Sequence, residues 1–217
     1  MRKLLQILRF CYHIDLVKYF YFNFISSIVK REKDCYILPN RGSRFEIDRT
    51  ARIYLRGNLT LNDHKLKHSK AECYLRMMKN TELYINGDVK CAFLSTIELH
   101  SGSKVSIGKA YINVGAVIMS EKEIEIGNDV LISRNVYIYD SDFHQILDES
   151  GNITNQAKKI TISNGAWLGV KSTILKGVKI GEGAILSANS TAMTRIKSHT
   201  IACGTPARPL MDVVDRK

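Results

Sequence analysis

The stretch from Ile162 to Ser190, ISNGAWLGVKSTILKGVKIGEGAILSANS, carries an aliphatic residue at every sixth position. Four residues after each aliphatic residue comes a small or aliphatic one. The two series are Ile162, Leu168, Ile174, Ile180 and Leu186, and Ala166, Ser172, Val178, Ala184 and Ser190. A period of six does not match the 3.6-residue repeat of an α-helix. A flat strand gives no reason to leave out the alternate positions between the sixth ones.

A triangular coil explains the spacing. If six residues form one flat face and one corner, three such units close a turn, and every sixth side chain points inward. The motifs IGND, ISNG and IGEG place Gly, Asn or Asp just after the aliphatic residue, where a sharp corner needs unusual backbone angles. Hexapeptide repeats of this kind indicate a parallel β-helix. The sequence therefore predicts a mainly β solenoid.

The same spacing occurs elsewhere and breaks twice. Further sets are Ile47, Ile53 and Leu59; Ile126, Ile132 and Ile138; and the weaker Ile85, Cys91 and Ile97. The interval from Ile107 to Ile112 is five, which predicts a bulge or a shortened corner. Residues 143–159 lack the inward pattern, so we expect them to form a loop that protrudes from the solenoid, and loops on rigid scaffolds often carry function.

The first 33 residues differ from the rest. They have near-helical apolar spacing, an aromatic cluster from Tyr19 to Phe24, and basic residues that end in the run Lys30, Arg31 and Lys33. Such a basic amphipathic helical arm suits either a membrane interface or packing on the protein or a neighbouring subunit. Its charges interrupt the apolar run, so we expect neither a signal peptide nor a membrane span. The expected division is an arm (1–33), a β-helix domain (34–210) and a tail (211–217).

The charge, the cysteines and the histidines of the sequence indicate which binding partners and which kinds of site to expect. The formal net charge of +11 predicts attraction to something anionic. The basic segment 65–70 lacks interleaved stacking aromatics, so no nucleic-acid contact is expected there. Five dispersed cysteines without a C-x-x-C motif favour reduced thiols in a cytoplasmic protein. His64 and His68 lack a third ligand at a convincing spacing, so we expect no metal site.

The segments IEIGNDVLISRNVYIYDSDFH, KKITISNGAWLGVKSTILKGVKIGEGAILSANS and IACGTPARPL resemble the hexapeptide-repeat acyltransferases. The resemblance covers roughly residues 100–210 and, more loosely, 40–100. It is strongest to the sugar O-acetyltransferase branch, which includes maltose and galactoside acetyltransferases and enzymes that modify capsule or O-antigen. It implies a left-handed β-helix, acetyl-CoA as cosubstrate, and a homotrimer with sites between subunits.

The resemblance also implies roles for individual residues. His144 corresponds to the catalytic base and Asn113 to an asparagine of the acceptor site. Four further positions match contacts to acetyl-CoA: Trp167, Gly169, Ala188 and Arg208. Two departures are Gln145, where many relatives have Pro, and Thr194, where Lys is frequent.

The chemistry fits a histidine at this place. Transfer of an acetyl group to a hydroxyl needs a base that is neutral near pH 7, and an imidazole ordinarily has a pKa of about 6.5. Asp140, Asp142 or a backbone carbonyl could orient the imidazole, and a backbone N–H near Gly169 could stabilise the oxyanion. Direct attack requires no protein nucleophile.

These observations favour an acetyl-CoA-dependent O-acetyltransferase acting on a sugar hydroxyl of a bacterial surface polysaccharide or its precursor. If the acceptor is lipid-linked, the arm would hold the active site near the cytoplasmic leaflet of the membrane. Two alternatives stay open: N-acetylation of an amino sugar nucleotide, and a non-catalytic trimeric scaffold at the membrane.

Overall fold

The computed structural model describes residues 11–64 and 68–212. The beginning of the expected arm, residues 1–10, lies outside this part, as do 65–67 and most of the expected tail, 213–217. Within the described residues, no helix combines the length and apolarity needed to cross a membrane.

A short helical segment lies near the start of the described residues. α2 (Leu16–Phe20) is capped by Asp15, whose side chain accepts a hydrogen bond from the Lys18 N–H. The π-helical turn η1 (Tyr21–Ile25) continues it. The helical expectation for residues 1–33 is wrong at its end, because Val29–Arg31 form a strand that pairs in parallel with Arg52–Leu55.

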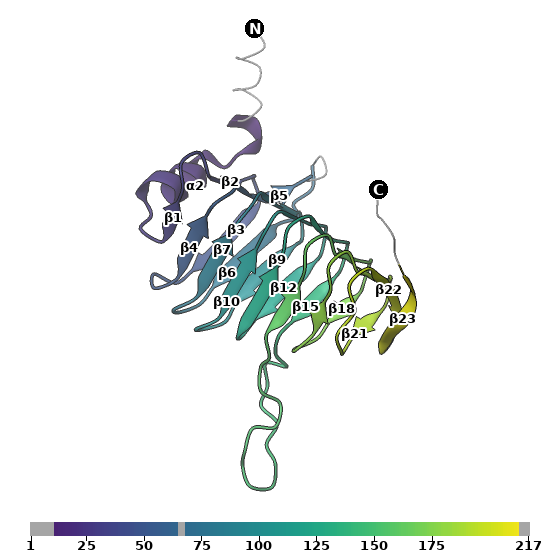
Figure 1. Cartoon of the computed structure of the whole chain (residues 1–217). Helices are drawn as coiled ribbons and strands as arrows, with labels where there is room; N and C mark the ends of the chain where they lie inside the picture. Colours follow the sequence, from purple (N-terminus) through teal and green to yellow (C-terminus); the bar gives the residue numbers. More distant parts are fainter. Residues whose placement is uncertain (1–10, 65–67, 213–217) are drawn as a thin grey trace.

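Three sheets form the body of the molecule (Figure 1). Sheet 1 contains, in order, β1 (Val29–Arg31), β4 (Arg52–Leu55), β7 (Glu82–Ile85), β10 (Lys104–Ile107), β13 (Glu123–Ile126), β16 (Ile160–Ile162) and β19 (Lys179–Ile180). Sheet 2 contains β2 (Ile37–Pro39), β5 (Leu59–Asp63), β8 (Val89–Ala92), β11 (Ala110–Ile112), β14 (Val130–Ile132), β17 (Trp167–Leu168), β20 (Ile185–Leu186), β22 (Thr200–Gly204) and β23 (Ala207–Asp212). Sheet 3 contains β3 (Ser43–Ile47), β6 (Cys73–Met77), β9 (Thr96–Leu99), β12 (Val117–Ser120), β15 (Tyr137–Tyr139), β18 (Thr173–Ile174) and β21 (Thr191–Ala192).

Each coil contributes one strand to each sheet in turn, so the molecule is the expected left-handed parallel β-helix. The strands of successive coils pair in parallel. Among the strands of residues 11–64 and 68–212, β22 and β23 alone pair in the antiparallel direction. We call the corner between sheets 2 and 3 the 2–3 edge, and the corner between sheets 3 and 1 the 3–1 edge. Residues on one edge in neighbouring coils lie about 4.8 Å apart.

The core fills the inside of the prism and follows the sixfold pattern. All ten residues of the two series between Ile162 and Ser190 are buried, with at most 1% of their surface exposed. The aliphatic residues stack on one another through the parallel register, as Leu168 does on Ile132 and Leu186. This confirms the inward assignment.

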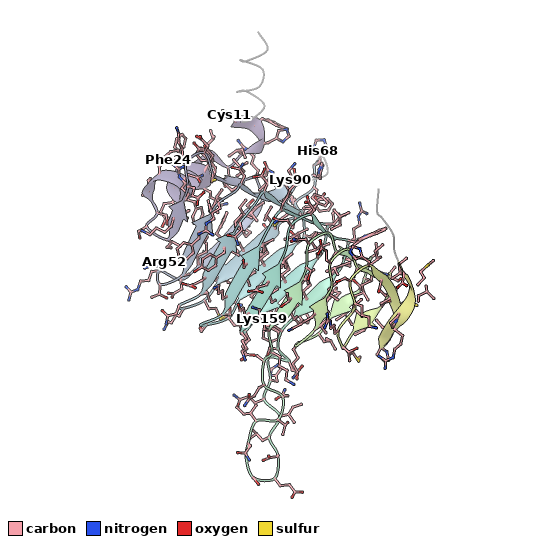
Figure 2. The ribbon with its side chains drawn as sticks, viewed as in Figure 1. Cys11, Phe24, Arg52, His68, Lys90 and Lys159 are labelled. Atoms are coloured by element: carbon pink, nitrogen blue, oxygen red, sulfur yellow. The ribbon has the colours of Figure 1, made fainter. Side chains whose placement is uncertain are left out.

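The two breaks in the pattern have different structures. The corner between β10 and β11 has only two residues, Gly108 and Lys109, whereas three separate β13 from β14. The insert between β15 and β16 projects from the prism (Figure 1) and is closed by an antiparallel bridge between Leu147 and Ile153. Lys159, at its base (Figure 2), pairs with Glu123 at 3.1 Å and Glu125 at 2.6 Å.

Candidate functional site

Three of the residues that sequence analysis singled out lie in one row along the 2–3 edge. Asn113 follows β11, Gly169 follows β17 and Ala188 follows β20. The coils of Gly169 and Ala188 are neighbours. One further coil, which carries Ser133, lies between the coils of Asn113 and Gly169. The row from Asn113 to Ala188 therefore extends over three coil spacings, about 14 Å.

Gly169 and Ala188 are in close contact. A Cβ on Gly169 would lie 2.6 Å from the Ala188 nitrogen, so only glycine fits this corner. The Gly169 N–H donates to the Leu186 carbonyl at 2.7 Å, which removes it as a donor to a ligand. In the described part of the chain, three N–H groups at these two corners have no backbone hydrogen bond, those of Val170, Ala188 and Ser190.

Trp167 points outward from sheet 2. Its side chain is partly exposed, and its indole N–H donates to Ser133 Oγ at 3.0 Å. Its neighbours in register continue an apolar ladder over the outer face of sheet 2, which we call the sheet 2 ladder. It consists of Tyr111, Leu131, Trp167, Ile185, Ile201 and Met211.

Arg208 lies on β23 opposite Cys203 and is exposed. The hairpin that holds it is fixed to the 2–3 edge, because the Gly204 N–H donates to Ser190 Oγ at 3.0 Å. Two further exposed cations, Arg134 and Lys171, lie on this edge and are joined by a backbone hydrogen bond of 2.9 Å. Positive charge therefore extends along the row, which suits a phosphorylated ligand.

His144 lies on the other side of sheet 3, at the beginning of the insert on the 3–1 edge. It lines a pocket of about 460 Å³ together with Glu121, Phe143, Asn155 and other residues of the insert. Its carbonyl accepts a hydrogen bond of 2.7 Å from the Asn155 side chain. Within the described residues, its exposed imidazole makes no hydrogen bond, which leaves both ring nitrogens available.

The two aspartates near His144 are bound to other groups. The buried carboxylate of Asp140 accepts hydrogen bonds from Ser120 Oγ and from three backbone N–H groups, those of Glu121, Lys122 and Glu123. Asp142 pairs with Lys176 and accepts a hydrogen bond from Asn155 at 2.8 Å. The bond from Lys176, followed by that from Asn155, lowers the pKa of Asp142. Both carboxylates thus fix the base of the insert.

One protomer does not bring the two groups of residues together. Asn113 lies on the 2–3 edge and His144 on the 3–1 edge, with the width of sheet 3 between them. That width is about 10 Å for the three residues of β15. Half of the expected site therefore lies at each side of sheet 3.

Sequence reasoning missed several residues that support these side chains: Ser133, Asn155 and Lys176. Each contacts a residue 13 to 34 positions away in the chain. Ser133 lies one coil before Trp167, and Lys176 lies one coil after Asp142. The sequence shows this spacing only when the residues of the insert are subtracted from the distance along the chain.

Residues 11–64 and 68–212 contain no group of three or more His, Cys, Asp or Glu side chains placed to hold an ion.

The chain is similar to curated sugar O-acetyltransferases. It is 31% identical to the galactoside O-acetyltransferase of Escherichia coli over 118 residues, which are 53% of this chain and 57% of that protein. It is 33% identical to the polysialic acid O-acetyltransferase of Escherichia coli over 138 residues, 62% of this chain and 42% of that protein. The chain spans about half the length of the curated relatives it matches. No protein-family profile matches it.

Solved structures share the fold. The polysialic acid O-acetyltransferase OatWY superposes with a TM-score of 0.60 at 21% identity, over 87% of this chain and 90% of that one. The N-acyltransferase AntD from Bacillus cereus gives a TM-score of 0.58 at 16% identity, over 88% and 86% of the two chains. These solved structures show the fold alone, and the curated relatives confirm the resemblance to sugar O-acetyltransferases.

Proposed function

We propose that this protein is an acetyl-CoA-dependent O-acetyltransferase that acts on a sugar hydroxyl of a bacterial surface polysaccharide or its precursor. The similarity to galactoside and polysialic acid O-acetyltransferases over half of the chain is the observation that carries the proposal. The available imidazole of His144 in a pocket supports it.

In the proposed mechanism, acetyl-CoA supplies the activated acetyl group and the 2–3 edge holds it. Trp167 and the Ala188 N–H would contact its acetyl and pantetheine parts, and the cations Lys171 and Arg208 its phosphates. An imidazole nitrogen of His144 takes the proton of the acceptor hydroxyl as the oxygen attacks the thioester carbon, and it later returns the proton to the departing thiolate. The Val170 N–H replaces that of Gly169 as the proposed oxyanion donor, because the latter is bound to Leu186.

The activity can be tested by measuring release of free CoA thiol from acetyl-CoA. The acceptors are a panel of glycans, lipid-linked sugars and nucleotide sugars, and wild type and His144→Ala are compared. We expect acceptor-dependent release that falls by about 10²–10⁴-fold in the variant, with acetyl-CoA binding retained. Normal turnover in His144→Ala, or no CoA binding by the wild type, would contradict the proposal. Reaction with amino sugar nucleotides alone would favour the N-acetyltransferase alternative.

We further propose that the active protein is a homotrimer whose sites lie between protomers. A neighbour packed on the sheet 2 ladder would cover its apolar side chains and provide the second half of the site. Asn113 and Trp167 of one protomer would then face the neighbouring copy of the insert that carries His144. The two-edge placement of these residues supports this arrangement.

Mixed trimers test the arrangement. His144→Ala and Asn113→Ala chains are each expected to be nearly inactive alone. If every site takes one residue from each of two protomers, random mixing restores a complete site at about one quarter of the interfaces. Mixtures as inactive as the separate variants would show that both residues act within one chain.

A third proposal concerns the membrane. Six apolar side chains on and beside α2 and η1 are exposed, from 46% at Tyr21 to 80% at Val17. This cap patch consists of Tyr12, Val17, Phe20, Tyr21, Phe24 and Ile25, and it lies at the end of the prism where Phe24 is labelled in Figure 2. The exposed Lys30 and Lys33 follow it. Exposed aromatic side chains beside cations suit the headgroup region of an anionic bilayer.

Vesicle sedimentation tests the cap patch. Wild type is expected to bind vesicles that contain phosphatidylglycerol in phosphatidylcholine and to release them at high salt. Phe20→Ser with Phe24→Ser should weaken binding, whereas Leu210→Ser, at the other end of the prism and 63% exposed, should not. Equal binding by all three proteins would contradict the membrane proposal, and a change in oligomeric mass of the double variant would favour packing on a neighbouring subunit.

A further inference from the structure

Phe143, directly before His144, has a backbone conformation that is unfavourable for its side chain. Its φ is +58°, in the left-handed region that glycine and asparagine occupy readily and bulky residues seldom do. Its N–H donates to Ser141 Oγ at 3.0 Å. This conformation sets the direction in which the chain leaves sheet 3, and it therefore sets the position of the His144 backbone.

The Phe143 ring is held by two other rings, which we call the ring seat. The His100 imidazole lies 4.8 Å from it, centroid to centroid, at an angle of 44°. The Tyr139 ring lies 6.1 Å away and meets it edge to face, at 89°. The edge-to-face contact with Tyr139 is a favourable geometry for aromatic pairs, and the tilted His100 ring lies within the same range of centroid distances. The ring contact thus compensates for the strained backbone of Phe143.

His100 is itself fixed in place, two coils before His144. Its backbone N–H donates to the Ser120 carbonyl at 2.8 Å. Its Nε2 atom lies 3.2 Å from Glu98 Oε1, without the alignment of a hydrogen bond. The same Glu98 oxygen accepts a hydrogen bond of 3.0 Å from Arg76, and the Glu98 side chain is only 14% exposed. The ring seat is therefore part of the rigid face of sheet 3.

The orientation of His144 depends on its neighbours, since its imidazole has no hydrogen bond of its own within the described residues. The carbonyl of His144 is held by Asn155 on one side, and Phe143 is held by the ring seat on the other. We propose that Phe143 and His100 are positioning residues that hold the His144 imidazole toward the acceptor. This inference rests on the proposed role of His144 as base.

Phe143 can act on His144 through its backbone conformation or through its ring, and a glycine at position 143 separates these two effects. Phe143→Gly keeps the left-handed conformation accessible, in fact favours it, and removes the ring. Phe143→Tyr keeps the ring. We expect Phe143→Gly and His100→Ala to lower kcat by 10-fold or more, with little change in the KM for acetyl-CoA, and Phe143→Tyr to stay within about threefold of the wild type.

A second readout needs no acceptor. The rate at which diethylpyrocarbonate modifies His144, followed by mass spectrometry of its peptide, reports how the imidazole is held. Phe143→Gly should change this rate severalfold, and Phe143→Tyr should not. His199→Gly is the matched control, because His199 also carries a ring with a φ of +52° but lies on the corner between sheets 1 and 2. That control should keep both the His144 rate and kcat.

Two results would overturn the inference. One is a Phe143→Gly protein with wild-type kcat and wild-type His144 reactivity. The other is a loss of activity in Phe143→Gly accompanied by an equal loss of acetyl-CoA binding and thermal stability, which would show a general structural role. If the wild type proves inactive as a transferase, the His144 modification rates still decide whether the ring seat positions the imidazole.

Discussion

At the scale of single residues, the carboxylate of Asp140 accepts more hydrogen bonds than that of Asp142, the other aspartate near His144. Alternation along an extended segment places 140, 142 and 144 on one side, which makes Asp140 a candidate for orienting His144. In the folded chain it instead joins two coils, since Ser120 and the N–H groups of residues 121–123 converge on it. Four donors within 2.7 to 3.0 Å leave the carboxylate no capacity for an imidazole.

Asp140→Ala should destabilise the protein, because it leaves a buried hydroxyl and three backbone N–H groups without an acceptor. We expect a loss on the order of 3 kcal/mol in the free energy of unfolding. Thermal denaturation measures it. Asp148→Ala is the control, since Asp148 caps the exposed tip of the insert through Ser150 and Asn152. Equal melting temperatures for the two variants would contradict the expectation.

Asp142 gives a pH dependence with a definite sign. Its bond to Lys176 lowers its pKa below the ordinary 3.8, so the carboxylate stabilises the folded insert above that value and stops doing so as the pH falls through the lowered pKa. Hydrogen exchange of residues 145–157 should therefore be constant from pH 7 to about 4, after correction for the intrinsic rate, and rise in stronger acid. Asp142→Asn at pH 7 should resemble the wild type in acid. Unchanged protection in that variant would show that the insert is held elsewhere.

At the scale of elements, the six-residue repeats form the coils of the β-helix. The insert projects from these coils and does not contribute to their stability. The Leu147–Ile153 bridge closes the distal part of the insert on itself, and the Thr154 N–H donates to the Ile146 carbonyl at 2.8 Å. Ile146 and Leu147 are 59% and 56% exposed, so the core gains nothing from them within one protomer.

Replacing residues 147–153 by a Gly-Asn turn should therefore leave the stability of the protomer nearly unchanged. The cost of closing a loop depends only weakly on its length, and we expect a shift in melting temperature below about 3 °C. Circular dichroism during heating measures it. A large loss of stability in the shortened chain would show that the tip contacts another part of the assembly.

At the scale of the whole molecule, the outer face of sheet 2 is the surface on which assembly depends in our proposal. The sheet 2 ladder runs without a charged residue from Tyr111 to Met211, and Leu131 within it is 41% exposed. A continuous apolar strip of this kind is typical of a covered surface.

Leu131→Glu should dissociate the oligomer while each protomer keeps its fold, because the side chain points outward. Light scattering after size-exclusion chromatography measures the mass. Tyr74→Glu on sheet 3 is a matched control, since Tyr74 has the same 41% exposure. An unchanged mass for Leu131→Glu, or the same change for both variants, would argue against the ladder as the interface.

The sequence by itself determined the coil. Inward residues at every sixth position allow one solution, because a prism interior admits aliphatic side chains at the faces and small ones near the corners. The shortened corner at Gly108 and the protruding insert were visible as deviations from that period. The sequence predicts a helical arm that is too long, because Val29–Arg31 pair with β4, and no local pattern in residues 1–33 indicates this distant partner.

Only the tertiary structure decided how the candidate residues are distributed. It placed Asn113, Gly169 and Ala188 on one edge and His144 on another, bound the Gly169 N–H to Leu186, and gave both aspartates other partners. The physical reason is that a solenoid brings together residues one coil apart. The number of residues in a coil varies with its corners and with the insert, so contacts such as those of Trp167 with Ser133 or Phe143 with His100 have no fixed spacing in the chain.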